Sequence, residues 1–296
     1  MLSILIPTYN YCIFPLVQAL QKQCEENNLV YEIIGIDDGS NSVLNLENEN
    51  INLLENCAFI PLSENIGLSE NRNLLATKAK YPNLLFIDGD SIIIAPNYIK
   101  NYLDSIEAND IVYGGRVHPE MVASPKQQLR WKYGRYIEDK TADQRNLSVF
   151  KTLMFNNTAI KKNCFDQIKF DANLKKYGHE DTLFAYQASV LNLKVLHIEN
   201  AIEHGDIDES AIFILKVKNS LNNLFLLDKE NKIKPGFIKI LRLYHFLRNY
   251  KLQYLAAGFF MVSNKILYKK LISKNPSLFL FNLYRIGYFC SINSKI

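Results

Sequence analysis

The sequence has few cysteines, and their spacing excludes several classes of protein. The five cysteines lie at positions 12, 24, 57, 164 and 290, an odd number without a C-x-x-C pair. A disulfide framework and a zinc ribbon are therefore excluded, and a reducing, cytoplasmic compartment is expected. The N-terminal MLSILIPTYN has no basic residue before its short apolar stretch, so we interpret it as a buried strand rather than a signal sequence.

Long apolar runs and the common glycine-rich phosphate motifs are also missing. The apolar stretch LAAGFFMV is far shorter than the roughly 20 residues that a membrane-spanning helix needs. Neither G-x-G-x-x-G nor G-x-x-x-x-G-K-[ST] occurs, which argues against a dinucleotide site and a P-loop. With 48% hydrophobic residues, the 296-residue chain can bury one large core with an appendage.

Acidic residues are absent from Gly236 to Ile296, where ten lysines and arginines occur among aromatic and aliphatic residues. Residues 211–296 carry 15 basic and 2 acidic residues, whereas residues 1–210 carry 19 and 28. We predict one domain over 1–210 and a basic, aromatic-rich helical extension over 211–296. The apolar density of 236–296 favours an anionic membrane surface, on the inner face of the cell membrane, over nucleic acid as its partner. A helical subdomain with solvated lysines is the simpler alternative.

Short apolar runs alternate with helical patterns in the first part of the chain. Residues 13–27 and 67–80 have apolar residues at helical spacing, and the runs around them end in polar or turn residues: LSILIPTYN, YEIIGIDDGS, CAFIPLSEN and NLLFIDGDS. This alternation predicts an α/β fold with a Rossmann-like, mixed but mainly parallel sheet flanked by helices. The asparagine-rich residues 45–52 are expected to form a loop before the third strand.

The polar ends of the four strands are expected to meet at one edge of the sheet, where ligands bind in such folds. Asp88 and Asp90 follow the fourth strand, with Gly89 between them to permit a tight turn. Carboxylates at this position can hold Mg²⁺ or Mn²⁺, with open positions left for the phosphates of a nucleotide diphosphate. A solvated turn or a helix N-cap is the alternative for the same residues.

Four motifs in this order resemble family 2 glycosyltransferases, which have the GT-A fold: SILIPTYN, IIGIDDGS, SENIGLSENRN and LLFIDGDS. The resemblance implies a donor site that binds a nucleotide sugar, with a UDP-sugar preferred. It implies that Asp38 binds the base, that Arg72 lies near the base or diphosphate, and that Asp88 and Asp90 face the sugar and the metal. The other donor-site residues that it implies are Pro7, Thr8, Tyr9 and Gly89.

These roles suit the chemistry of the side chains. An ionised Asp38 can accept a hydrogen bond from an N–H of the base. Arg72 offers a bidentate fork to phosphate or to a carboxylate such as Asp38 or Asp88. The alternative is a structural salt bridge beside a helix that starts at Gly67.

A second motif, GHED, opens an apolar-periodic segment in the last part of the predicted domain. It places Glu180 and Asp181 at a helix N-terminus, where the helix dipole stabilises negative charge. An ordinary acidic first turn is the alternative. The segments KKYGHEDTLFAYQ and VLHIENAIEHGD resemble the carboxyl-terminal part of a galactosyltransferase catalytic domain. The resemblance implies that Glu180 binds the acceptor, Asp181 is the general base and His204 is a metal ligand.

Four further residues are candidates for binding the acceptor. Asn156 and Asn157 precede the second motif, and their amides can bond sugar hydroxyls; a plain strand end is the alternative. His179 adjoins the candidate base. Trp131 lies in the polar, aromatic segment 116–150, where it can stack on a sugar or anchor an amphipathic helix.

Together these features predict a metal-dependent, inverting glycosyltransferase with Mn²⁺ or Mg²⁺ as cofactor. The acceptor is predicted to be a hydroxyl of a glycan or lipid-linked glycan in surface polysaccharide or oligosaccharide synthesis. Transfer to a polyprenyl phosphate is one alternative, and it needs no general base because the acceptor is already ionised. Two further alternatives are a non-catalytic glycan- or nucleotide-binding homologue and a basic nucleic-acid binder.

Overall fold

The computed structural model describes residues 1–294. The chain forms two compact units, which are described separately. The sheet unit comprises residues 1–118, 139–175 and 180–206, and the helical unit comprises residues 119–138, 176–179 and the chain from Ile207 onward. The predicted division at residue 210 assigns 119–138 and 176–179 to the first domain. In the structure these two segments belong to the helical unit.

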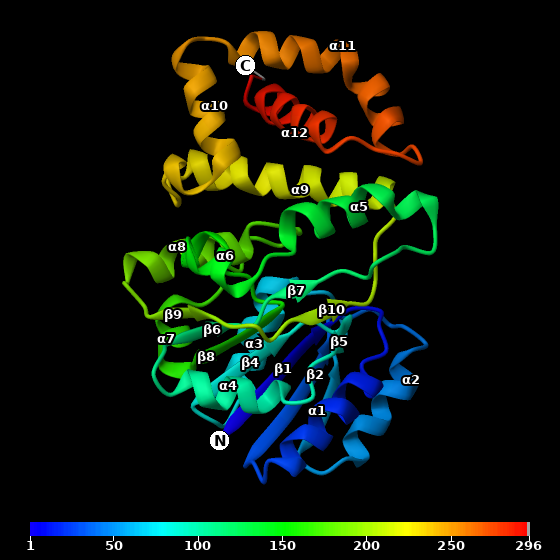
Figure 1. The fold of residues 1–296 in the computed structure, drawn as a ribbon, viewed down its shortest axis with the longest axis vertical. Coiled ribbons are helices and arrows are strands. Elements are labelled where there is room, and N and C mark those ends of the chain that lie inside the picture. Colours follow the sequence, from blue (N-terminus) through cyan, green and yellow to red (C-terminus); the bar gives the residue numbers. More distant parts are fainter. Residues whose placement is uncertain (295–296) are drawn as a thin grey trace. The chain divides into compact units, whose positions relative to one another are not determined.

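The sheet unit is built on a seven-stranded sheet with the strand order β3-β2-β1-β4-β8-β6-β9 (Figure 1). The first four strands in this order run parallel, β8 runs antiparallel to its neighbours β4 and β6, and β9 is parallel to β6. The prediction of a mixed, mainly parallel sheet is therefore confirmed. The strands are β1 (Leu2–Thr8), β2 (Tyr31–Asp37), β3 (Cys57–Pro61), β4 (Asn83–Ile87), β6 (Ile111–Tyr113), β8 (Asn157–Lys161) and β9 (Val195–His197).

Helices cover both faces of this sheet because successive side chains of a strand point to opposite faces. Leu85 and Ile87 of β4 belong to a core that also includes residues of α1 (Phe14–Glu26) and α4 (Tyr98–Ile106). Phe86, between them, packs instead in a cluster of aromatic rings. The other rings of this cluster come from Phe155, Phe165, Phe170 and Phe184.

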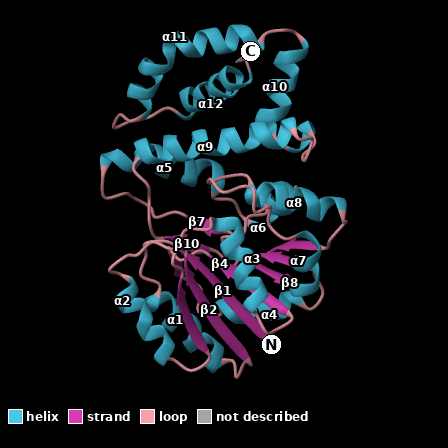
Figure 2. Cartoon of the chain, turned by 180° about the vertical axis from the view of Figure 1, so that it is seen from behind, coloured by secondary structure: helices cyan, strands magenta, loops and turns pink. Residues whose placement is uncertain are grey.

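The second face of the sheet carries α3 (Leu68–Lys78), α7 (Lys162–Ile168) and α8 (Glu180–Val190), and α3 is seen across this face in Figure 2. The short elements α6 (Ala142–Asn146) and η4 (Val149–Lys151) precede β8. β8 itself begins at Asn157.

Residues 45–53 form a helical segment where a loop was expected. The segment comprises α2 (Asn45–Asn48) and η1 (Glu49–Leu53). Asn48 is completely buried; its Oδ1 accepts the backbone N–H of Ile13 at 2.8 Å, and its Nδ2 donates to the carbonyl of Tyr11 at 2.9 Å. The segment thus fixes the loop that follows β1, which a composition rich in asparagine does not reveal.

A second, three-stranded sheet lies in the same unit, with the order β5-β10-β7. It consists of β5 (Ser91–Ile93), β7 (Arg116–Val117) and β10 (Ile202–His204). β10 runs antiparallel to β5 and parallel to β7. Although short, this sheet joins residues that are far apart in the sequence.

The helical unit has a core of its own. Leu129 of α5 (Gln128–Tyr133) is buried with Phe213 of α9 (Ser210–Lys229) and with residues of α11 (Gln253–Leu271) and α12 (Leu278–Asn293). A β-carbon on Gly287 of α12 would lie 2.8 Å from the β-carbon of Phe260, so this glycine lets α11 and α12 approach closely.

The remaining elements are η2 (Pro125–Gln127), η3 (Gly134–Glu138), η5 (Pro235–Phe237) and α10 (Lys239–Asn249). Within residues 1–294, no helix combines the length and apolar character needed to cross a bilayer.

Candidate active site

One arginine connects the end of β4 with the start of α8. The side chain of Arg72 on α3 is 2% exposed. Its Nη2 donates to Asp88 Oδ1 at 3.0 Å, and its Nη1 donates to Asp181 Oδ1 at 2.7 Å. The two carboxylates are 32% and 21% exposed. The structure therefore brings together three of the residues that the sequence singled out.

Arg72 is held in place by the start of its helix and by an aromatic ring. Both oxygens of Asp38 accept backbone N–H groups, those of Ile66 at 2.8 Å and Gly67 at 3.0 Å, directly before α3. Gly67 has φ +88°, a conformation that favours glycine. The guanidinium carbon of Arg72 lies 5.2 Å from the centre of the Phe170 ring. Burial lowers the pKa of Arg72, but Asp181 and Asp88 outweigh it and raise that pKa overall.

The backbone before β8 orients the two carboxylates. The second oxygen of Asp181 accepts the N–H of Phe155 at 3.1 Å, and the N–H of Asp88 donates to the carbonyl of Asn156 at 3.1 Å. Burial raises the pKa of Asp88, and the nearby carboxylates of Asp90 and Asp181 act in the same direction, against the lowering effect of Arg72. Asp181 is thus held by two donors, the guanidinium of Arg72 and the N–H of Phe155.

Asp90 has a different partner from Asp88. Its Oδ2 lies 3.2 Å from Nδ1 of His204. The pairing of β5 with β10 sets His204 opposite Ser91, and the N–H of Gly205 donates to the carbonyl of Asp90 at 2.8 Å. The sequence predicted the two aspartates as a pair. In the structure they have different partners, because Asp88 contacts Arg72 and Asp90 contacts His204.

The pair of Asp90 and His204 suits a divalent metal ion. Adjacent ligands of an octahedral ion with bonds of about 2.1 Å are about 3 Å apart, close to the separation of these two donor atoms. Within residues 1–294, no cluster of three or more His, Cys, Asp or Glu is placed to hold a metal. The protein would therefore supply two ligands, and phosphate oxygens and water would supply the others.

Several buried polar atoms at this edge of the sheet have no hydrogen-bond partner among residues 1–294. They are Oγ1 of Thr8, Oγ of Ser91, Nε of Arg72 and both amide atoms of Asn156. Buried polar groups are rarely left without partners, so these atoms are candidates for bonds to a ligand. A β-carbon on Gly89 would lie 2.9 Å from Oγ1 of Thr8, which shows how closely the turn after β4 approaches the end of β1.

The structure adds residues that the sequence did not single out. The ring of His118 packs edge-to-face against that of His204, with 5.4 Å between centres, and its Nδ1 lies 2.6 Å from Asp139. Burial, followed by the charges of Asp90 and Asp206, raises the pKa of Tyr11. Ser91 directly follows the D-G-D segment, and Tyr11 directly follows P-T-Y-N. Their positions after predicted strands could have identified them from the sequence.

The other donor- and acceptor-site candidates of the sheet unit occupy varied environments. Pro7 is buried in β1, whereas Tyr9 after it is 60% exposed. Glu180 is buried in the first turn of α8. Asn157 is completely buried: Oδ1 accepts the hydroxyls of Tyr98 and Tyr102, and Nδ2 donates to the carbonyls of Gly115 and Asn200. Its amide therefore belongs to the core of the sheet unit.

Two predicted acceptor residues belong to the helical unit. Trp131 lies on α5, and its Nε1 donates to the carbonyl of Pro119 at 2.8 Å. Burial and the charge of Arg285 lower the pKa of His179 to about 4, so this histidine is neutral near pH 7. Trp131 is therefore a helix residue with its polar atom bonded.

Comparisons with known proteins agree with the fold of the sheet unit. The family model described as glycosyl transferase family 2 matches residues 3–168. This range includes Arg72, Asp88 and Asp90 but ends before Asp181 and His204. No curated protein matches the chain.

Two solved structures are similar. The mannosyltransferase PcManGT from Pyrobaculum calidifontis, in complex with GDP-Man and Mn²⁺, is 13% identical, with a TM-score of 0.56 over 100% of this chain and 88% of its own. TarS 1–349 from S. aureus is 22% identical, with a TM-score of 0.50 over 74% of this chain. The match spans 64% of that TarS chain.

At such identities the structural likeness shows the fold alone, and it is the GT-A fold that the sequence motifs predicted. The family match covers more than half of the chain and includes the four motifs that carried the resemblance. The prediction of the family is therefore confirmed. The chain belongs to glycosyl transferase family 2.

Proposed function

We propose that this protein is a metal-dependent, inverting glycosyltransferase that moves a sugar from a nucleotide diphosphate to a hydroxyl group of a glycan. One observation carries the proposal: the buried guanidinium of Arg72 bonds both Asp88, after the donor-site strand, and Asp181, the candidate base. One guanidinium group thereby holds both the candidate donor-site carboxylate of Asp88 and the candidate base Asp181.

Asp181 is proposed as the general base. Arg72 and the N–H of Phe155 stabilise its carboxylate form, which is the form that can accept a proton. As the acceptor oxygen attacks the anomeric carbon, its proton passes to Asp181, and the bond from that carbon to the phosphate oxygen breaks. Attack from the side opposite the leaving group inverts the configuration. Glu180, in the same turn, is proposed to accept a hydrogen bond from the acceptor.

The donor site is proposed to lie at the carboxyl ends of β1, β2 and β4. Asp90 and His204 would hold Mn²⁺ or Mg²⁺, which would offset the charge that develops on the leaving diphosphate. The unpartnered hydroxyl of Thr8 and amide of Asn156 are proposed to bond the substrates. Thr8 is assigned to the donor and Asn156 to the acceptor. A UDP-sugar is the proposed donor; TarS has been solved with UDP-GlcNAc, and PcManGT with GDP-Man.

Calorimetric titration with UDP and GDP, with and without Mn²⁺, tests this proposal. We expect one nucleotide to bind more tightly with Mn²⁺, and we expect Asp90→Ala and His204→Ala to abolish the effect of the metal. Asp104→Ala is the matched control, because Asp104 is an exposed aspartate on α4 in the same unit. Binding of neither nucleotide, or binding that ignores both the metal and the two site variants, would contradict the proposal.

The proposed acceptor is attached to a lipid, because one face of α11 is suited to a membrane surface. Four apolar residues repeat at intervals of four, three and four residues: Leu255, Phe259, Val262 and Ile266. Their exposed fractions are 71%, 59%, 85% and 66%. We call these residues the apolar stripe of α11.

Lysines accompany the apolar stripe, including Lys265, Lys269 and Lys270 on the same helix, and residues 236–294 contain no acidic residue. Outward apolar side chains with cations beside them are typical of a helix that lies on an anionic bilayer. The inner face of the cell membrane is the proposed location, since the five free cysteines suit a reducing compartment.

Vesicle co-sedimentation tests the membrane partner. Val262→Glu is expected to weaken binding to phosphatidylglycerol vesicles about tenfold or more, since it replaces a proposed apolar contact with the bilayer by a charge. Val43→Glu is the matched control, because Val43 is 75% exposed in the sheet unit. Equal binding by both variants, or binding of the protein to oligonucleotides but not to vesicles at physiological salt, would exclude the proposed surface.

A further inference from the structure

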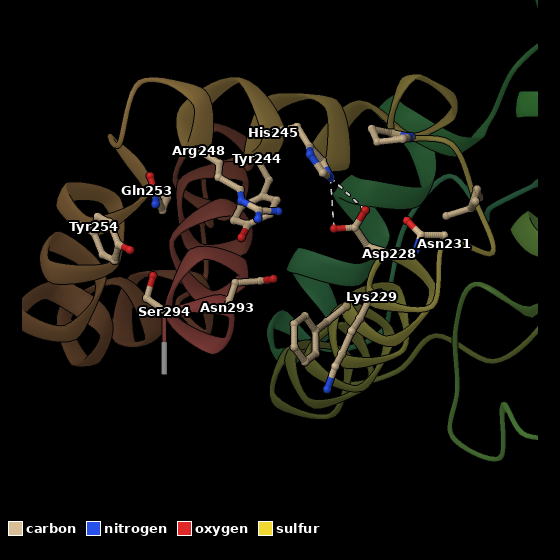
Figure 3. Close-up of a pocket in the computed structure, with 13 residues that line it drawn as sticks. Asp228, Lys229, Asn231, Tyr244, His245, Arg248, Gln253, Tyr254, Asn293 and Ser294 are labelled. Atoms are coloured by element: carbon tan, nitrogen blue, oxygen red, sulfur yellow. Dashed lines mark hydrogen bonds and ion pairs between the residues drawn. The ribbon is translucent and has the colours of Figure 1, made fainter. Parts of the chain in front are cut away.

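A cavity of about 560 Å³ lies within the helical unit, apart from every residue assigned to the reaction. It is formed by the end of α9 and the segment after it, by α10, by the first turn of α11 and by the end of α12. Figure 3 shows the polar side chains that point into it from these elements. We call this cavity the α9–α12 pocket.

The charges that line the α9–α12 pocket are mostly positive. Among the described residues that line it, Asp228 is the acidic one; it is paired with His245, whose Nε2 lies 2.9 Å and 3.1 Å from the two carboxylate oxygens. Arg248 and Lys229 also line the pocket, and neither has an ion-pair partner among residues 1–294. Two uncompensated cations at one cavity favour a ligand with a phosphate or similar anionic group.

The pocket also contains hydrogen-bonding atoms that lack partners. Gln253 is only 8% exposed, and its Oε1 is buried without a hydrogen-bond partner in the described part of the chain. The hydroxyl of Ser294 is in the same state. A carbonyl-type oxygen such as Oε1 only accepts hydrogen bonds, so phosphate oxygens cannot satisfy it but a ligand hydroxyl can.

We propose that the α9–α12 pocket binds a phosphate group that carries a hydroxylated substituent. Arg248 and Lys229 pair with the phosphate, and Gln253 accepts a bond from a hydroxyl of the substituent. A phosphatidylglycerol-type headgroup and a soluble sugar phosphate share this chemistry.

The structure favours the lipid as the source. Tyr254, which lines the pocket, immediately precedes Leu255, the first residue of the apolar stripe of α11. A lipid whose headgroup occupies the pocket would have its acyl chains beside the stripe. This choice of source rests on the membrane surface proposed above, whereas the phosphate pocket itself does not.

Calorimetric titration of the full-length protein tests whether the pocket binds phosphate. The probes are glycerol 1-phosphate and inorganic phosphate, both without divalent metal, so that the donor site lacks the ion proposed to hold phosphate there. We expect Arg248→Ala to weaken both probes about tenfold or more, because a charge-assisted bond is lost. Arg242→Ala is the matched control, since Arg242 is exposed on the same helix but does not line the pocket.

Two further variants separate binding from a merely structural effect. Asp228→Asn removes the acidic side chain of the pocket, and it is expected to strengthen the binding of both probes. Gln253→Met removes the hydroxyl acceptor at similar size, and it is expected to weaken glycerol 1-phosphate but not inorganic phosphate. Opposite effects from two substitutions in one pocket do not arise from loss of folding.

Vesicles of phosphatidylglycerol and of phosphatidylcholine distinguish the two sources. If Arg248→Ala weakens binding to phosphatidylglycerol vesicles, the ligand is the lipid; if it affects only the soluble probes, the ligand is a free phosphate. If none of the probes binds, or if Arg248→Ala and Arg242→Ala behave alike with all of them, the pocket is not a phosphate site. Because Arg248 lies outside the donor site, absence of nucleotide binding would leave this result unaffected.

Discussion

Replacement of Arg72 with leucine removes the single cation between two carboxylates. Leucine fills part of the same buried space, but it leaves Asp88 and Asp181 without the partner that now lies 3.0 Å and 2.7 Å away. The variant therefore places two like charges at one site with neither compensated. We expect it to fold less stably and to lose the orientation of the candidate base.

The size of the effect follows from burial. Breaking a buried ion pair from one side costs about 3–5 kcal/mol, because a desolvated charge is left alone. Here the arginine is buried, but the carboxylates are 32% and 21% exposed, so water can compensate them in part. We therefore expect the lower end of that range, about 3 kcal/mol at pH 7.

The loss should depend on pH in a defined direction. Without Arg72, ionised Asp88 and Asp181 destabilise the folded state, and protonation of either removes that penalty. The difference between wild type and Arg72→Leu should therefore shrink as the pH falls from 7 towards the acid range. A double variant, Arg72→Leu with Asp88→Asn, should recover part of the loss at pH 7, because one of the two charges is gone.

Urea unfolding followed by circular dichroism measures these differences. Lys80→Met is the matched control: Lys80 is 77% exposed and lies 3.7 Å from Glu32, so its loss should cost about 0–1 kcal/mol. A loss below about 1 kcal/mol for Arg72→Leu, or a loss of the same size at acid pH, would refute the idea that this arginine compensates two carboxylates.

Four other substitutions have defined outcomes. Asp181→Asn should lower turnover about 10²-fold or more with nucleotide affinity unchanged if the acceptor is a hydroxyl, whereas turnover that persists would indicate an ionised phosphate acceptor. Asn157→Leu should lower stability by about 2–4 kcal/mol in urea, because two tyrosine hydroxyls lose their acceptor, while Asn156→Ala should raise the KM for the acceptor at nearly unchanged stability. Burial lowers the pKa of His197 to about 4, so stability should fall between pH 6.5 and 4, and His197→Gln should flatten that decline.

The positions of strands and helices in the sheet unit could largely be predicted from the sequence. β1 and β2 are buried along their whole length and β4 is buried from Leu84 onward, and each predicted strand ends at polar residues close to where the structure ends it. This succeeds because burial on both faces of a parallel sheet leaves a local signal. The segment 45–53 lacked such a signal, since its role depends on the side chain of Asn48 bonding a loop 35 and 37 residues away.

The members of the candidate site could be predicted better than their partners. Arg72, Asp88, Asp181 and His204 all belong to motifs, but the bond from Arg72 to Asp181 spans 109 positions. No local pattern encodes which carboxylate a buried guanidinium will meet. Asn157 shows a second limit of the sequence. It is the same residue type as its neighbour Asn156, but β8 begins at Asn157, and the amide of Asn157 lies in the core.

The register of β10 determines which side chain lies beside Asp90 as a candidate metal ligand. In β10, Glu203 and His204 are adjacent, so they point to opposite faces of the three-stranded sheet. Insertion of one residue into the connection between β9 and β10 would bring Glu203 to the position of His204. An imidazole favours transition metals, whereas a second carboxylate favours Mg²⁺ or Ca²⁺. Among homologues, a change in loop length would then alter metal preference without any substitution at the ligands themselves.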